Sequence, residues 1–267
     1  MSFYLSYFKL RFITSLQYKA QAIAGILTQI FFGFVFIMVY LAFYESNNNV
    51  DVMSLSELIT YLWLGQAFFS LTYIYYRDNE IFNIIKNGNI AYELIRPRKL
   101  YFIWYFKILG VRLAGVLLRF LPVLVLAFLL PYPYKLSLPY NFISFILFIV
   151  TLFIGTLLVT SFICFYHILS LKLLNDKGIV VILCGIADIF SGGVVPIPFF
   201  PKYLKFIANI LPFRYIFDLS YRVYSNNIGT NEALFGIVVQ LLWFLIITLL
   251  GYILLNKILK KVIVQGG

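Results

Sequence analysis

The sequence is poor in charge and in the side chains that perform chemistry. Only 12% of its 267 residues are charged, against roughly 25% in ordinary soluble proteins. At the same time 63% are hydrophobic, which is more apolar surface than one water-soluble core of this length can bury. The shortage of charge therefore excludes a soluble globular domain. It predicts an all-α integral membrane protein, in which lipid surrounds the apolar side chains.

Motifs for catalysis and metal binding are also missing. There is one histidine, His167, and the two cysteines, Cys164 and Cys184, lie in apolar runs where a thiol behaves as a small hydrophobic group. The sequence has no metal-spaced cluster of His, Cys and carboxylates, no G-x-S-x-G elbow and no G-x-x-x-x-G-K-[ST] phosphate loop. These absences argue against a metal site and against an enzyme, including one that acts on lipid. Any use of ATP requires another polypeptide.

Six long apolar segments dominate what is present. A helix needs about 20 apolar residues to cross about 30 Å of hydrocarbon. The predicted spans are residues 21–43, 58–76, 108–130, 140–167, 178–198 and 233–256. We therefore expect a single transmembrane domain, residues 1–267, built from six helices.

The basic residues are distributed unevenly between the two sides that six spans create. Fourteen of the 21 lie in the N-terminal segment, in residues 77–107 and 168–177, and in the C-terminal tail, whereas the other side has five. Because cytoplasmic loops are enriched in Lys and Arg, we expect the cytoplasmic (inner) membrane and both termini in the cytoplasm. The net charge of +11 is assigned to contact with anionic lipid and not to nucleic acid.

Two further elements are expected at the membrane surfaces. Residues 1–20 combine aromatic side chains at near-helical spacing with three bases, which favours a helix lying in the cytoplasmic interface; a frayed basic leader is the alternative. The stretch SGGVVPIPFFP has two glycines and three prolines, which disfavour a continuous helix. Residues 199–232, interrupted by Pro212, are therefore expected to enter the outer leaflet and return as an extracellular re-entrant region.

Charged and amide side chains within the predicted spans are the candidates for function there. Arg119 and Asp188 lie at similar predicted depth, where an unpaired charge costs at least about 2.5–3.5 kcal/mol, so both are expected to face the protein interior. They are interpreted as a pair that packs two helices, or as part of an ion or substrate path. Arg112, near a span end, is expected to snorkel to the interface. Gln29 and Gln66 either hydrogen-bond between helices or line a substrate path.

The longest connection, residues 77–107, is polar and patterned. Helical potential from Glu80 to Lys86 ends at Gly88, and a second short helix is expected to end at Arg96, since the residue before a proline disfavours helical geometry. The isoleucines on one side of the first helix are Ile81, Ile84 and Ile85. We expect a compact helical turn that contacts a soluble partner. An ordinary basic loop against lipid headgroups is the alternative.

This loop carries the motif of a known family. The stretch KNGNIAYELIRPRKLYF resembles the loop between the second and third spans of type-2 ABC transporter permeases, with the pattern G-x-I-x-x-x-L-I/L-R-P. The matching positions are Gly88, Ile90, Leu94, Ile95, Arg96 and Pro97. The likeness covers essentially the whole chain: an N-terminal interfacial helix, six spans, and a segment LPFRYIFDL before the last span.

The resemblance implies a permease subunit of an ATP-driven exporter. Two such chains, identical or different, would associate with two ATP-binding subunits, which hold the ATP and Mg. The coupling helix would run from Glu80 through Glu93 to Arg96. The bases of the re-entrant region would receive an anionic or amphipathic substrate, or else anchor to lipid; they are Lys202, Lys205, Arg214 and Arg222. An ion-coupled transporter or channel that uses Arg119 and Asp188 is the alternative function.

Overall fold

The computed structural model describes residues 2–46, 52–87, 90, 93, 98–173 and 176–260. Within them the fold is entirely helical, so the predicted all-α class is confirmed. The α-helices are α1 (Ser2–Leu16), α2 (Lys19–Ser46), α3 (Leu55–Ala67), α4 (Phe69–Thr72), α5 (Asn79–Lys86), α7 (Leu100–Leu129), α8 (Phe142–Leu173), α9 (Asp176–Ser191), α10 (Lys202–Ile210), α11 (Asp218–Tyr224) and α12 (Thr230–Leu259). Two 3-10 helices, η1 (Ile197–Phe199) and η2 (Phe213–Tyr215), flank α10.

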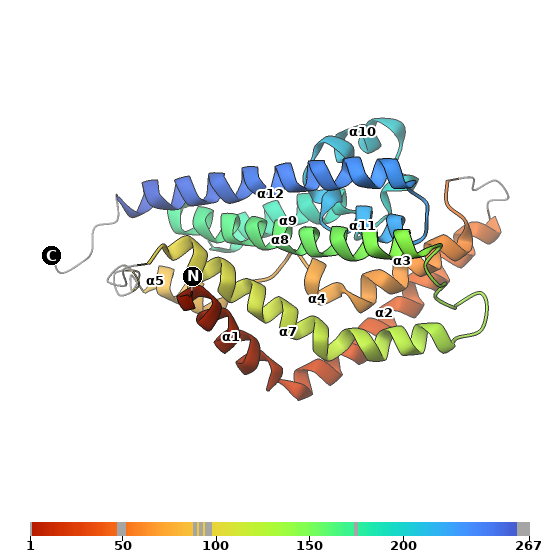
Figure 1. Ribbon diagram of the computed structural model, residues 1–267, viewed down its shortest axis with the longest axis horizontal. Helices are drawn as coiled ribbons and strands as arrows, with labels where there is room; N and C mark the ends of the chain where they lie inside the picture. Colours follow the sequence, from red (N-terminus) through yellow and green to blue (C-terminus); the bar gives the residue numbers. More distant parts are fainter. Residues whose placement is uncertain are drawn as a thin grey trace.

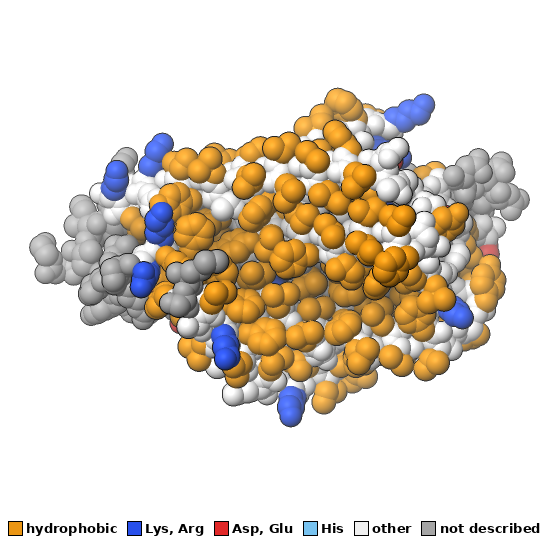
Figure 2. All heavy atoms as spheres, in the orientation of Figure 1, with side chains coloured by type: hydrophobic (Ala, Val, Ile, Leu, Met, Phe, Trp, Pro, Cys, Tyr) orange, Lys and Arg blue, Asp and Glu red, His pale blue; other side chains and the backbone are white. Residues whose placement is uncertain are grey.

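Four helices in the described part of the chain are long and apolar enough to cross a membrane. They are α2, α7, α8 and α12, whose apolar segments have 28 to 31 residues and a mean hydropathy of 2.1 to 2.8. At a rise of about 1.5 Å per residue, each exceeds the hydrocarbon thickness of about 30 Å. Figure 2 shows hydrophobic side chains over the middle of one face, with Lys and Arg toward its margins. The chain is a multi-pass membrane protein.

The predicted span over residues 58–76 is interrupted. It is divided between α3 and α4, which meet at Phe68, and the helix ends after Thr72. α3 itself begins at a capping box, in which the Ser54 side chain accepts from the Glu57 N–H and the Glu57 side chain accepts from the Ser54 N–H. The residues from 73 to 78 lie outside any helix, a feature that determines the site described below.

The predicted span over residues 178–198 is shorter in the structure. α9 stops at Ser191, and Gly192 follows with a φ of +86°, a left-handed conformation that favours glycine. A Cβ at Gly192 would lie 2.7 Å from the hydroxyl of Tyr61, so this turn also needs a residue without a side chain. With α3 and α9 both short, the count of six membrane-crossing helices stays a prediction.

The N-terminal helix is a separate element. α1 and α2 are divided at Gln17 and Tyr18, and α1 lies against the first half of α7 (Figure 1). The ring of Tyr4 stacks on that of Phe106 at 6.0 Å, and its hydroxyl accepts a hydrogen bond of 3.1 Å from the Lys99 N–H. Part of the aromatic face of α1 is therefore covered by α7. Its position at a membrane interface stays a prediction.

The two ends of the molecule carry different elements. In Figure 1, α7, α8 and α12 lie along the longest axis, with α5 at one end and α10 and α11 toward the other. α8 is central, with half of its apolar segment buried. The Gln240 amide of α12 joins it by donating to the carbonyl oxygens of Thr151 at 2.8 Å and Tyr215 at 2.7 Å. An apolar middle thus separates two polar ends.

Candidate coupling site and basic cavity

α5 begins at a buried aspartate. Asp78 precedes the helix, and its Oδ1 accepts hydrogen bonds of 3.0 Å from the backbone N–H groups of Glu80 and Ile81. A carboxylate here satisfies donors that have no partner inside the helix and complements the positive end of the helix dipole. Ile81 and Phe82 are buried, whereas Asn83 is exposed. α5 therefore packs one face on the protein and presents another to the outside.

Charged side chains from two other helices converge on this helix start. Lys107 of α7 places its Nζ 2.7 Å from Asp78 Oδ1 and 2.8 Å from Glu80 Oε2. Arg11 of α1 donates from Nη2 to both oxygens of Glu80, at 2.6 and 2.5 Å. Burial opposes ionisation of Glu80, but the hydrogen bonds and charges of Lys107 and Arg11 outweigh it and lower the pKa of that carboxyl. We call Arg11, Asp78, Glu80 and Lys107 the charge cluster.

The single histidine adds a fourth helix to this arrangement. His167 of α8 accepts a hydrogen bond at Nε2 from the Asp78 N–H, 3.2 Å away, and its Nδ1 lies 2.7 Å from the carbonyl oxygen of Ile163. Because Nε2 accepts, the ring proton is on Nδ1, which donates to that carbonyl; this is the neutral tautomer. The imidazole packs 4.7 Å from the ring of Phe82 on α5. His167 thus joins α8 to α5.

The non-helical residues between α4 and α5 are held by side chains from three helices. Arg112 of α7 donates to the carbonyl oxygens of Tyr73, at 2.9 Å, and Leu71. The Tyr166 hydroxyl of α8 donates to the carbonyl oxygen of Tyr76, and the Cys184 thiol of α9 lies 3.7 Å from that of Ile74. Irregular backbone at membrane depth is tolerated only where such partners satisfy it. The carbonyl oxygens of Tyr73, Ile74 and Tyr76 thus each have a side-chain donor.

The prediction that Arg112 snorkels to the interface is therefore wrong. Its side chain is only 3% exposed, since it turns inward to the carbonyl groups that the end of α4 leaves without helical partners. The sequence does not reveal the helix break that requires this donor.

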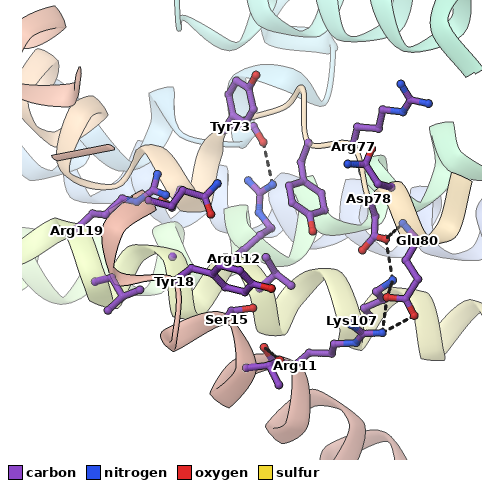
Figure 3. Close-up of a pocket in the computed structure, with 18 of the residues that line it drawn as sticks. Arg11, Ser15, Tyr18, Tyr73, Arg77, Asp78, Glu80, Lys107, Arg112 and Arg119 are labelled. Carbon is purple, nitrogen blue, oxygen red and sulfur yellow. Dashed lines mark hydrogen bonds and ion pairs between the residues drawn. The ribbon is translucent and has the colours of Figure 1, made fainter. Parts of the chain in front are cut away.

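A cavity of about 760 Å³ opens beside the charge cluster. Its walls are the elbow between α1 and α2, the segment from α4 to α5, and one face of α7. Figure 3 shows Lys107, Glu80 and Arg11 together at one end, Arg119 at the other, and Tyr18 between them. Five basic residues line it against two acidic ones, Asp78 and Glu80; the bases are Arg11, Arg77, Lys107, Arg112 and Arg119. We call this space the basic cavity.

Comparison with known proteins decides the family. The profile of a family described as "ABC-2 family transporter protein" matches residues 19–266, nearly the whole chain. The chain belongs to the ABC-2 transporter family. No curated protein and no solved structure gave a match. The resemblance inferred from the loop motif is confirmed, and the protein is a transmembrane permease subunit of an ABC transporter, a kind of subunit that is generally not catalytic and works with ATP-binding subunits.

The loop motif of this ABC-2 permease is only partly described. Outside the described residues lie Gly88, Arg96, Pro97 and the side chain of Ile85. Ile84 is half-buried on α5, and Glu93 is half-buried further along the loop. The role of these positions in coupling stays a prediction. Glu80 has the clearest place, in the charge cluster.

The two charges that the sequence predicts to lie within the membrane are in different cavities of the permease. Arg119 lines the basic cavity, while Asp188 lines a second cavity of about 340 Å³ together with Gln66 and aromatic side chains. No ion pair joins Arg119 to Asp188 among the described residues. Gln29 is buried on α2 and lines neither cavity. The structure thus gives no support to the packing pair, and Gln66 is the amide that faces open space.

The bases of the permease's predicted re-entrant region divide into two kinds. Asp218, with no exposed surface, lies 3.9 Å from Arg214 and 3.6 Å from Arg222, so these two guanidinium groups compensate a buried carboxylate. Lys202 is exposed on α10, and Lys205 is half-buried there. Pro212 lies just before η2, where it turns the chain from α10 toward α11. Only the lysines are placed to meet a substrate or lipid.

Sequence reasoning missed Asp78, Lys107 and Tyr166. The first had a readable signal, because an Asp two residues before Glu80 is typical of a helix start. The other two had none, since their partners are 29 and 90 residues away in the chain.

Proposed function

We propose that this permease exports a substrate across the cytoplasmic membrane, powered by separate ATP-binding subunits that dock on α5 and the loop after it. The observation that carries the proposal is the anchoring of α5. Asp78, at its start, is bonded to Lys107 of α7 and to His167 of α8, and Glu80, in its first turn, is bonded to Arg11 of α1. A helix that is exposed on one side and tied to three others on the other side suits the transfer of movement.

The physical requirement for coupling is a difference in binding. ATP-driven closure of a partner shifts the permease only if the closed partner binds one conformation of the permease better than another. A displaced α5 would have to carry Lys107 and His167 with it or break the buried bonds to Asp78. Movement of α5 is therefore expected to reach α7 and α8 directly, with α1 following through the Arg11–Glu80 pair.

The rest of the assembly follows from the family resemblance and the charge pattern. We infer two ATP-binding subunits, which hold the ATP and Mg, and a second permease chain, identical or different. Both termini and α5 would be cytoplasmic, and α10 and α11 would lie on the outer side. In the outer region, Lys202 and Lys205 are the bases left to meet an anionic or amphipathic substrate, because Arg214 and Arg222 are engaged by Asp218.

Docking is tested by placing a charge on the exposed side of α5. Asn83→Arg is expected to abolish co-purification with the ATP-binding subunit of this transporter, because a long cation would occupy the contact surface. The permease itself should fold, since exposed substitutions of this kind usually change stability by about 0.5 kcal/mol or less. The matched control is Asn231→Arg, also exposed but in the first turn of α12 at the other end of the molecule. Equal co-purification of both variants would refute docking on α5.

A further inference from the structure

Two arginines of the basic cavity, Arg112 and Arg119, have no carboxylate partner among the residues that the structure describes. The two acids in the lining, Asp78 and Glu80, are already bonded to Lys107 at one end. Arg112 donates to backbone carbonyl oxygens, and its Nε has no hydrogen-bond partner. Arg119 forms neither an ion pair nor a hydrogen bond with any residue in the described ranges, and its Nε is buried without a partner. The middle and the far end of the cavity therefore carry positive charge that no carboxylate in the described part of the chain neutralises.

Uncompensated charge in such a place is unfavourable. Burial removes the water that would otherwise stabilise a guanidinium group, and nearby backbone carbonyl dipoles replace it only in part. Arg112 is only 3% exposed. Arg119 is partly buried on the same face of α7, two turns further along. An anion between them would relieve this cost for both side chains.

The surroundings of Arg119 are shaped for its guanidinium group. A Cβ at Gly25 would lie 2.7 to 2.9 Å from the guanidinium atoms of Arg119, so the glycine of α2 leaves the space that this group occupies. Ser15, Tyr18 and Ser70, whose side chains carry hydroxyl groups that can act as neutral donors, line the same cavity. Guanidinium forks and hydroxyls together are the donors typical of sites for phosphate-type anions.

We propose that the basic cavity binds a phosphate-type anion, with Arg119 as its main ligand and Arg112 as a second cation beside it. The cavity also has apolar walls, including Phe69, Val111 and Leu118, next to the phosphate position. The phosphate group belongs either to an anionic lipid headgroup or to a soluble phosphate. This assignment concerns binding to the permease alone and does not depend on the direction of transport.

Binding is measured on the purified full-length chain in nanodiscs of phosphatidylcholine. One arm titrates dioleoyl phosphatidylglycerol in the disc, and the other titrates inorganic phosphate and pyrophosphate in solution. Arg119→Gln is expected to weaken binding about tenfold, which corresponds to about 1.4 kcal/mol. Arg119→Lys should lose less, because it keeps the charge but not the planar fork. Gly25→Ala should also weaken binding, since its methyl group displaces the guanidinium.

The control is Lys257→Gln, which removes an exposed base of α12 outside the cavity and is expected to leave binding unchanged. Binding of phosphatidylglycerol alone identifies a lipid headgroup as the source, and binding of pyrophosphate as well identifies a site open to soluble anions. The proposal is overturned if neither probe binds, if Arg119→Gln and Gly25→Ala bind like the wild type, or if Lys257→Gln weakens binding as much. A melting curve for each variant separates a lost site from a lost fold.

Discussion

Lys107→Met removes the cation that lies between two carboxylates at the start of α5. Methionine is an unbranched apolar side chain one atom shorter than lysine, so the change acts mainly on charge. Asp78, which is buried, then loses its ion pair while still accepting the two N–H groups of α5, and Glu80 keeps Arg11. The converse variant, Asp78→Asn, keeps an acceptor for those N–H groups and leaves Lys107 with Glu80 at 2.8 Å.

The two variants differ in what they leave unpaired. Removing one partner of a buried ion pair typically costs about 3–5 kcal/mol, which is the expected loss for Lys107→Met. Asp78→Asn is expected to cost about 1.5–3 kcal/mol, the range for a hydrogen bond to a charged group, because Lys107 retains a second carboxylate. In the double variant no lone carboxylate remains at position 78, so its loss should be smaller than the sum of the two single losses.

The assay is equilibrium unfolding of the purified chain in mixed micelles, followed by intrinsic fluorescence. Glu232→Gln serves as the control, because the Glu232 side chain is 59% exposed and lies 3.8 Å from Arg214; an ion pair with such an exposed carboxylate is expected to contribute about 0–1 kcal/mol. Losses that add up in the double variant, or a smaller loss for Lys107→Met than for Asp78→Asn, would show that Lys107 does not neutralise Asp78 in the folded protein.

Three further predictions concern pH and two tight contacts. The pKa of Glu80 is lower in the folded state, so its ionised form stabilises the fold above its unfolded pKa of about 4.3. This stabilisation is lost as the pH falls through the lower pKa of the folded state. Melting curves between about pH 3 and pH 6 should therefore show an acid-induced loss of stability, and Glu80→Gln should reduce that loss. Gly192→Ala should lower the free energy of unfolding by at least about 1 kcal/mol, because φ is +86° and Tyr61 is close, whereas Gly229→Ala, with nothing within 4 Å of the new methyl group, should be tolerated. Gly155→Ala should cost about 1–3 kcal/mol in the same assay, because its Cβ would meet a backbone carbonyl at the end of η2 and force α8 away from its neighbours; an unchanged midpoint would contradict this packing.

Continuous apolar runs made the long helices predictable. α2, α7, α8 and α12 each fill most of a predicted segment, because twenty or more apolar residues without charge have few alternatives to a membrane helix. The same reasoning failed to show that residues 58–76 are interrupted after Thr72. Hydropathy reports which residues avoid water, and the residues around Tyr73 and Ile74 are as apolar as those of a helix. Their non-helical backbone depends on donors such as Arg112, which only the fold brings near.

For the charged residues of the predicted spans, too, the sequence predicted one property and the structure decided another. Their cost in lipid predicted that Arg119 and Asp188 face away from lipid, and both line cavities. Their relative depth along two helices did not predict whether they meet, since depth says nothing about which way each helix is rotated. Arg119 instead reaches toward Gly25 on α2, and Asp188 lies near Gln66 and the glycine turn after α9.

The sequence by itself determined the class of this protein: its apolar runs require lipid, and the motif from Gly88 to Pro97 indicates the family. These properties are local, so they can be read in a single stretch of chain. The tertiary structure decided which charges meet. Asp78, Lys107 and His167 come from three separate parts of the sequence. Whether a buried acid and base form an ion pair depends on the distance between them, and the packing of the helices sets that distance.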